Sequence, residues 1–323
     1  MRFAVESWSP EYGSPTESMG LTDSSGPVDP WVESDVGDWA PRVPDPAAEP
    51  FASVAFVDGV RRVEANVFIT GTDGLVRQGI CASYAAGVVH CGARATVVAA
   101  EVRRGLFAPA DGADTLVTRH GRFDLHPTTS DEPDVLSLRL QRAMGELESE
   151  VAAAATDHHA VDAVVVDGPL RLGLHRPGFI GYVKTHHAAY GPPLVRDIVT
   201  RLGCGERTPL LLLDGPVARY SWYLRLPCSV AHGWDGIVRL EAAADTAVAA
   251  AVVLADRVAC TLARFASVPH KDPRAPQNLV PIGGLERDLR HRLGDPQLLL
   301  RSLRLAAVTT PREGPGPAGS VPT

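Results

Sequence analysis

Two short apolar runs that end in Asp-Gly are the residues of this chain best suited to chemistry. They are Phe56-Val57-Asp58-Gly59 and Val165-Val166-Asp167-Gly168. Each is typical of a buried strand that ends in a carboxylate, because Gly permits a sharp turn after it. Two such carboxylates, with an acidic helix between them, predict a site for divalent metal ions, the arrangement that a metal-dependent phosphodiester-cleaving enzyme needs. We interpret a similar pair, Asp214-Gly215, as a structural turn.

The helix between these runs offers a third carboxylate. Its apolar stripe recurs at helical spacing: Leu136, Leu140, Met144, Leu147 and Val151. At 100° per residue, Glu148 lies about 75° from the centre of the stripe, Glu150 about 85° and Glu146 about 125°. A metal ligand must border the buried face, so Glu148 is the predicted ligand and Glu150 the alternative.

The elements around these acids follow a recognisable order. Residues 54–58, 64–71, 75–81 and 85–90 read as β-strands, with a turn at Gly71-Thr72-Asp73-Gly74. The helix then extends to about residue 155 and a buried strand covers 163–166. Three or more antiparallel strands followed by a helix and a strand open the RNase H-like fold, so we predict the α/β class: an RNase H-like mixed sheet flanked by helices.

The second half of the chain alternates strands and helices. Strands are predicted at 179–184, 210–213, 220–226 and 236–240, and helices at 193–202, 243–265 and 282–293. Lys184 ends a strand near the acids, where its charge could hold the scissile phosphate. Arg219 and Tyr223 are four residues apart on one strand, hence on one face, and could contact a DNA backbone.

Composition separates the termini from the body. Residues 1–50 hold ten of the 38 acids and two of the 31 bases, which leaves a nearly neutral body of 28 acids and 29 bases. We predict an acidic irregular arm over 1–50, pinned by its tryptophans, a single domain over 51–305 and a disordered tail over 306–323. Five cysteines without CxxC spacing, no signal peptide and no membrane-length apolar segment predict a cytoplasmic protein with reduced thiols.

Several motifs, taken in order, resemble the NurA nucleases over roughly residues 50–300. They are Phe56-Val57-Asp58-Gly59, the acidic helix, Val166-Asp167-Gly168-Pro169-Leu170, Gly181-Tyr182-Val183-Lys184, Arg219 to Leu226, and Val238-Arg239-Leu240-Glu241. The resemblance implies a Mn²⁺-dependent (or Mg²⁺-dependent) DNA exo- and endonuclease with an RNase H-like fold. It also implies a homodimer that docks on a HerA-type hexameric ATPase and processes DNA ends.

The resemblance assigns metal binding and catalysis to Asp58, Glu148 and Asp167. The family closes its site with a histidine in the last helix, but the matching region here, Pro281-Ile282-Gly283-Gly284-Leu285-Glu286, has none. Glu286 is the predicted substitute, since a carboxylate also suits Mn²⁺, and Asp272 in the preceding loop is a weaker candidate.

Two other functions remain open from the sequence. A family member without the histidine could be a catalytically inactive DNA-binding or clamp subunit. A phosphotransferase of the actin and sugar-kinase class also uses strand-end aspartates. That class needs glycine-rich phosphate hairpins in both halves, and Gly71-Thr72-Asp73-Gly74 has no counterpart after Asp167-Gly168.

Overall fold

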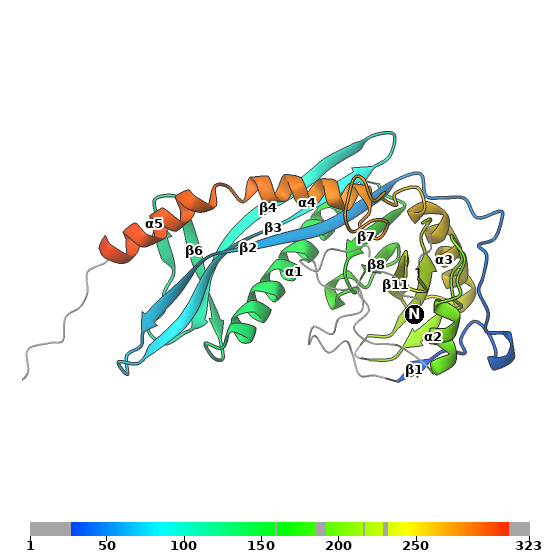
Figure 1. The fold of residues 1–323 in the computed structure, drawn as a ribbon, viewed down its shortest axis with the longest axis horizontal. Coiled ribbons are helices and arrows are strands. Elements are labelled where there is room, and N and C mark those ends of the chain that lie inside the picture. Colours follow the sequence, from blue (N-terminus) through cyan, green and yellow to red (C-terminus); the bar gives the residue numbers. More distant parts are fainter. Residues whose placement is uncertain (1–26, 159, 185–191, 216, 229–231, 310–323) are drawn as a thin grey trace, which may run out of the picture. The chain divides into compact units, whose positions relative to one another are not determined.

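The fold was analysed in a computed structural model, which describes residues 27–158, 160–184, 192–215, 217–228 and 232–309 (Figure 1). The strands are β1 (Val28–Asp29), β2 (Val54–Thr70), β3 (Val76–Cys91), β4 (Ala95–Pro109), β5 (Leu116–Thr118), β6 (Gly121–Thr128), β7 (Ala163–Asp167), β8 (Phe179–Val183), β9 (Leu211–Leu213), β10 (Arg219–Arg225) and β11 (Ile237–Ala243). The helices are α1 (Pro133–His158), α2 (Pro193–Val199), α3 (Val248–Leu262), α4 (Val280–Arg292) and α5 (Pro296–Thr309), with short 3-10 turns at Val36–Asp38 and Leu172–Leu174. Among the described helices, none combines the length and the apolar character that crossing a lipid bilayer requires.

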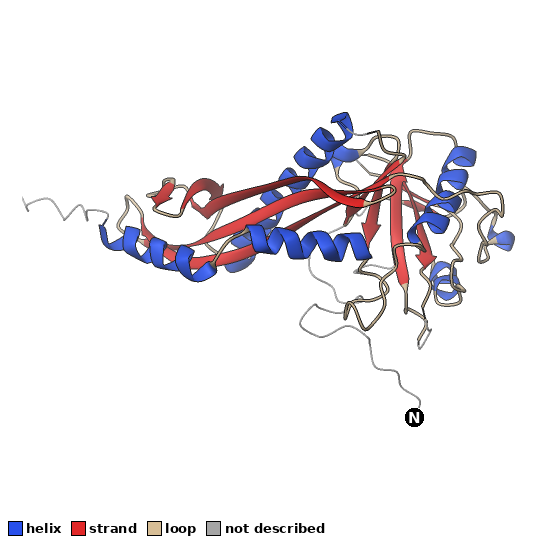
Figure 2. Cartoon of the chain, turned by 90° about the horizontal axis from the view of Figure 1, so that it is seen from above, coloured by secondary structure: helices blue, strands red, loops and turns tan. Residues whose placement is uncertain are grey.

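The strands form one mixed sheet in the order β1-β9-β10-β11-β8-β7-β2-β3-β4-β6-β5. Strand β2 runs parallel to β7, with Val57 opposite Val166, and β7 runs parallel to β8. The run β4-β3-β2-β7-β8, with α1 leading into β7, is the strand order expected of an RNase H-like sheet. The predicted fold class, a mixed α/β sheet with flanking helices, is therefore confirmed (Figure 2).

Several predicted boundaries in the first half were wrong. The predicted strands 54–58 and 64–71 are one strand, β2, so Gly59 continues the strand instead of making a turn. Likewise 75–81 and 85–90 merge into β3. Strands β4 and β6 were missed, because residues 95–109 lack a clear alternation of polar and apolar residues and β6 contains Pro127. The turn before β3 is present, with Gly74 at φ 78°.

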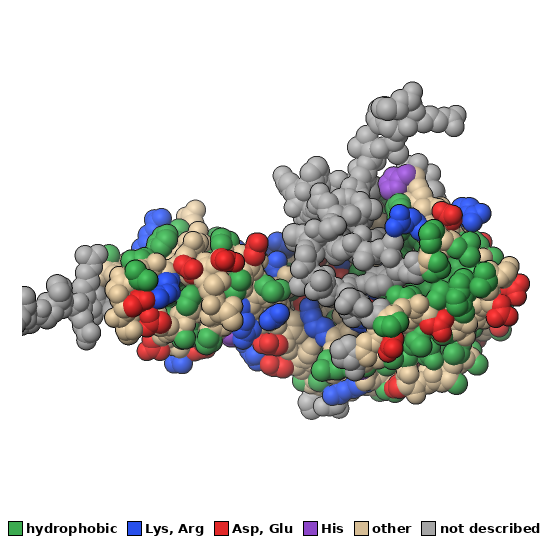
Figure 3. Space-filling view, turned by 90° about the horizontal axis from the view of Figure 1, so that it is seen from below, with side chains coloured by type: hydrophobic (Ala, Val, Ile, Leu, Met, Phe, Trp, Pro, Cys, Tyr) green, Lys and Arg blue, Asp and Glu red, His purple; other side chains and the backbone are tan. Residues whose placement is uncertain are grey.

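The chain divides into two compact units. The first comprises Met1–Gly59, Ala86–Glu101 and Leu147–Asp288, and the second Val60–Ala85, Val102–Glu146 and Leu289–Thr323. The first unit contains β7 to β11, α2, α3 and most of α4, and its core includes the edge-to-face pair Phe56–Phe265 with ring centroids 4.8 Å apart. On the face drawn in Figure 3, acidic and basic side chains lie interspersed, in keeping with the near-neutral body of the chain.

The second unit has its own small core. It contains β5, β6 and α5, and its buried cluster joins Cys81, Leu106, Ala108, Phe123 and Leu303. Helix α5 was not predicted, and it continues to Thr309, past the predicted start of the tail at 306. The remainder of that tail, 310–323, lies outside the described residues.

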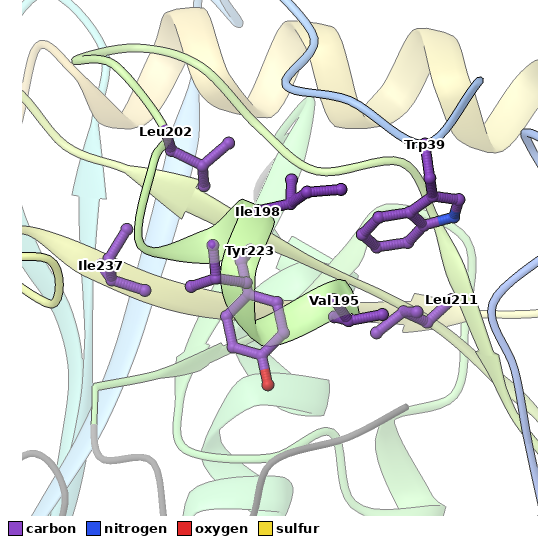
Figure 4. Close-up of a cluster of buried hydrophobic side chains, with 8 residues drawn as sticks. Trp39, Val195, Ile198, Leu202, Leu211, Tyr223 and Ile237 are labelled. Carbon is purple, nitrogen blue, oxygen red and sulfur yellow. The ribbon is translucent and has the colours of Figure 1, made fainter. Parts of the chain in front are cut away.

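A second hydrophobic cluster, in the first unit, includes a residue of the predicted N-terminal arm. Trp39 packs with residues of α2, the segment after it, β9, β10 and β11: Val195, Ile198, Val199, Leu202, Leu211, Tyr223 and Ile237 (Figure 4). Its indole N–H donates to the carbonyl of Pro30 at 2.6 Å. Arg207, itself buried, donates two hydrogen bonds to Glu33, each of 3.0 Å. Packing and ion pairing thus fix residues 30–42, whereas 1–26, with Trp8, lie outside the described residues.

Candidate metal centre

Three carboxylates of the first unit converge on one point. They belong to Asp58 of β2, Asp167 at the end of β7 and Glu286 of α4, and one oxygen from each lies within 4.8 Å of the others. The parallel pairing of β2 and β7 explains why Asp58 and Asp167 lie side by side. Val57 lies opposite Val166, and each aspartate is the next residue on its strand. Carboxylate oxygens at this spacing are the hard donors that Mg²⁺ and Mn²⁺ prefer.

Asp58 has the least compensated carboxylate of the three. It is 5% exposed, and its Oδ1 accepts the N–H of Gly59 at 2.7 Å. Its Oδ2 is buried and has no hydrogen-bond partner among the described residues. Burial, followed by the negative charge of Asp167, raises the pKa of Asp58 well above its ordinary value. A buried carboxylate oxygen without a hydrogen-bond partner is suited to binding a cation. The Oδ2 atom of Asp58 is therefore the observation that makes the cluster a candidate metal site.

Asp167 is held by the predicted catalytic lysine. Lys184, next after β8, donates from Nζ to Asp167 Oδ2 at 2.6 Å and to Asn278 Oδ1 at 3.1 Å. Burial alone would lower the pKa of Lys184, but the carboxylates of Asp167, Asp58 and Glu286 outweigh it and raise that pKa. The lysine is therefore a cation inside the carboxylate cluster, and its contact with a scissile phosphate stays a prediction.

The loop after Asp167 is shaped by glycines and by a buried acid. Gly168 has φ 102°, and a Cβ at Gly181 would lie 2.6 Å from the backbone nitrogen of Leu170. The N–H of Leu170 donates to Glu241, which is fully buried, at 2.9 Å. Glu241 also accepts from Arg219 at 3.2 Å and from Arg239 at 2.6 Å, so β10 and β11 fix the loop that follows the metal ligand.

Glu286 is paired with an arginine that the sequence did not indicate. Arg274 donates from Nη1 to Glu286 Oε1 at 3.0 Å and from Nη2 to Oε2 at 2.5 Å. The backbone N–H of Arg274 donates to Asp272 at 2.8 Å, and Asp272 also accepts from Asn278 at 2.7 Å. Because Asn278 accepts from Lys184, these hydrogen bonds connect the ion pair of Glu286 to that of Asp167.

The predicted helix ligand, Glu148, lies near the cluster but outside the set of three. It is 2% exposed, whereas Glu146 and Glu150 are exposed, as the helical geometry indicated. Its carboxylate accepts a hydrogen bond from Arg171. Its negative charge contributes to the raised pKa of Asp58, so it is electrostatically coupled to the centre. A ligand role for Glu148 stays a prediction, and it requires that Arg171 release the carboxylate of Glu148.

The two predicted DNA-contacting residues have internal partners. Tyr223 is 2% exposed and belongs to the cluster of Figure 4, so the prediction that its side chain reaches DNA was wrong. Core packing of β10 against α2 is the physical reason. Arg219 is half-buried and bonded to Glu241, so its contact with DNA stays a prediction. Asp214, interpreted as structural, is exposed and accepts the N–H of Gly215 at 2.9 Å.

Sequence reasoning missed Arg274 and Asn278, and it offered Asp272 only as a weaker candidate ligand. All three lie in the segment between α3 and α4, where neither helical nor strand periodicity applies. Polar residues beside prolines do indicate a shaped loop in this segment, but that signal does not select a partner for Glu286.

Comparisons with known proteins give a family and a distant structural likeness. A family model described as NurA domain matches residues 53–282. No curated protein matches the chain. Among solved structures, the chain is similar to a variant of endonuclease V of Ciona intestinalis, in complex with a 23mer DNA containing an inosine followed by a ribo-adenosine. The two sequences are 10% identical, and the TM-score is 0.32. The match covers 75% of this chain and 86% of that chain. The family match includes Asp58 and Asp167 and reaches into α4, four residues short of Glu286.

Proposed function

Because the chain belongs to the NurA-domain family, a family of nucleases, we propose that it is a metal-dependent deoxyribonuclease. The observation that carries the proposal is the convergence of Asp58, Asp167 and Glu286, with a buried oxygen on Asp58 that has no partner in the described part of the chain. We propose Mn²⁺, or Mg²⁺ in its place, as the cofactor, because three hard oxygen donors suit either ion.

The residues of the site have separate tasks in this proposal. Asp58, Asp167 and Glu286 would hold the ion, with Glu148 as a further ligand. Bound there, a divalent cation supplies Lewis-acid polarisation of a phosphodiester and a more acidic water. Lys184 orients Asp167 through its 2.6 Å hydrogen bond and keeps a positive charge beside the reacting phosphate. The buried network around Glu241 keeps the Asp167 loop in place while DNA binds.

Degradation of end-labelled DNA tests the proposal. Wild-type protein is incubated with single- and double-stranded substrates in Mn²⁺, Mg²⁺ or EDTA, beside Asp58→Ala and the matched control Asp214→Ala. Both aspartates accept the N–H of the following glycine, but Asp214 is exposed and outside the cluster. We expect Mn²⁺-dependent cleavage by wild type and the control, and none by Asp58→Ala.

The rival function is an inactive DNA-binding or clamp subunit. It gains support from one observation: Glu286 stands in the helix where the family places a histidine, and Arg274 occupies both of its oxygens. No cleavage by folded wild-type protein, combined with DNA binding that does not depend on Mn²⁺, would favour this rival over the nuclease.

The proposal extends to partners and biological role. We propose that the chain acts on DNA ends as a homodimer, together with a HerA-type hexameric ATPase. In this proposal ATP hydrolysis comes from that ATPase, since the 323 residues of the sequence contain no Walker A motif. Purification with the cognate ATPase should give a stable complex that degrades duplex DNA faster with ATP than without it; failure to form the complex would restrict the proposal to the nuclease alone.

A further inference from the structure

Arg274 is bound directly to Glu286, and the function proposed above gives its guanidinium no role. Its two terminal nitrogens bind the two oxygens of Glu286 at 3.0 and 2.5 Å. One oxygen of Glu286 also belongs to the set that lies within 4.8 Å of Asp58 and Asp167. The guanidinium is therefore one hydrogen bond away from the metal centre.

The pairing leaves Glu286 in conflict with metal binding. A carboxylate that accepts two hydrogen bonds from a guanidinium is a poorer ligand for a divalent cation, because both cations draw on the same negative charge. Burial alone would lower the pKa of Arg274, but Glu286 and Asp272 outweigh burial and raise that pKa. Metal binding through Glu286 thus weakens the half-buried ion pair between Glu286 and Arg274.

Asp272 keeps Arg274 at the site after such a change. Its Oδ1 accepts the backbone N–H of Arg274 at 2.8 Å and lies 3.6 Å from the Nε atom of the same residue. Its Oδ2 is fixed by Asn278 at 2.7 Å. A guanidinium that is released from Glu286 would therefore still have the carboxylate of Asp272 beside it, close to the three carboxylates.

On this geometry, and resting on the nuclease function proposed above, we propose that Arg274 exchanges partners during the reaction. In the metal-free protein it binds Glu286; when Glu286 turns to a divalent cation, Arg274 turns to a non-bridging oxygen of the scissile phosphate. The guanidinium suits both partners, because its planar fork matches carboxylate and phosphate alike. Arg274 is then a counter-ion of the metal-free site and a phosphate-binding catalytic residue of the loaded one.

Two measurements on the same variants test the exchange. The variants are Arg274→Gln, Arg274→Lys and the control Arg287→Gln, which removes an exposed positive charge one residue after Glu286. Mn²⁺ affinity is measured without DNA by electron paramagnetic resonance, and the kcat and KM of DNA cleavage are measured at saturating Mn²⁺. Circular dichroism and thermal melting confirm that each variant folds.

The exchange predicts opposite changes in the two measurements. Arg274→Gln should bind Mn²⁺ at least about threefold more tightly than the control, because no guanidinium competes for Glu286. The same variant should lose about 100-fold in kcat with little change in KM, as for removal of one donor to a developing charge. Arg274→Lys should keep wild-type Mn²⁺ affinity and recover part of the kcat, since it retains the charge but lacks the fork.

Two outcomes would overturn the exchange: equal Mn²⁺ affinity in Arg274→Gln and the control, or an unchanged kcat in Arg274→Gln. A different outcome would refute the proposed nuclease function. If wild type does not cleave DNA but Arg274→Gln still binds Mn²⁺ more tightly, the nuclease is refuted while the competition between Arg274 and the cation stands.

Discussion

Replacing Asp58 with Asn should make the metal-free protein more stable while it removes metal binding. The oxygens of the cluster lie within 4.8 Å of one another, so two of the carboxylates repel each other by about 3 kcal/mol at an effective dielectric constant of about 20. Lys184 offsets part of this repulsion. We therefore expect a net gain of about 1–3 kcal/mol for the neutral amide, or an increase in Tm of about 1–4 °C.

The pH dependence of this gain has a definite sign. Because the pKa of Asp58 is raised in the folded state, its protonated form stabilises wild type below the ordinary carboxyl value of 3.8, and this contribution is lost as the pH rises through the raised pKa. The advantage of Asp58→Asn should therefore grow with pH and shrink toward pH 3.8.

Differential scanning fluorimetry in EDTA across pH 5–9, repeated in excess Mn²⁺, measures both effects. Mn²⁺ should raise the Tm of wild type and of the control Asp214→Asn, but not that of Asp58→Asn, because only an intact site gains binding energy on folding. The reasoning is refuted if Asp58→Asn is no more stable than wild type at high pH, or if Mn²⁺ stabilises it as much as wild type.

Three further variants address the surroundings of the site. Arg171→Met should lower the free energy of unfolding by about 1–2 kcal/mol, because the buried carboxylate of Glu148 loses its ion pair with Arg171, and the double variant with Glu148→Gln should regain most of it in urea titrations. Gly181→Ala should reduce Mn²⁺-dependent cleavage and lower the Tm, since its Cβ would lie 2.6 Å from the nitrogen of Leu170; unchanged cleavage would show that the loop adapts. Trp39→Ala should cost about 3 kcal/mol in urea titrations by leaving a cavity in its cluster, and an effect below about 1 kcal/mol would mean that the arm contributes little.

The sequence predicted the parts of this protein that depend on local patterns. Apolar runs ending in Asp58 and Asp167 identified two strands that pair in parallel, and the helical stripe favoured Glu148, which is buried, over its alternative Glu150, which is exposed. The strand boundaries failed at Gly59, because a glycine that permits a turn does not require one, and sheet pairing over seventeen residues of β2 determined the outcome.

The arginines that pair with Glu286 and Glu148 could not be predicted from the sequence, for a different reason. Arg274 is twelve residues from Glu286 and Arg171 is 23 from Glu148, and neither spacing corresponds to a helix face or a strand face. For Tyr223 the sequence predicted a contact with DNA, but the side chain is buried in the core. Alternation along β10 gives the face of the sheet but not what covers it, and here the cover is α2 with Trp39.

The buried network at Glu241 has a consequence for how freely the Asp167 loop can change. Glu241 holds the loop through the backbone N–H of Leu170, a group that every residue except proline possesses. Exchanges among apolar side chains at 170 should therefore be tolerated, whereas loss of the carboxylate at 241 would leave Arg239, which is 2% exposed, without that partner. An engineer who wishes to redesign this loop has freedom at the residues beside the metal ligand and very little on a strand 71 positions further along the chain.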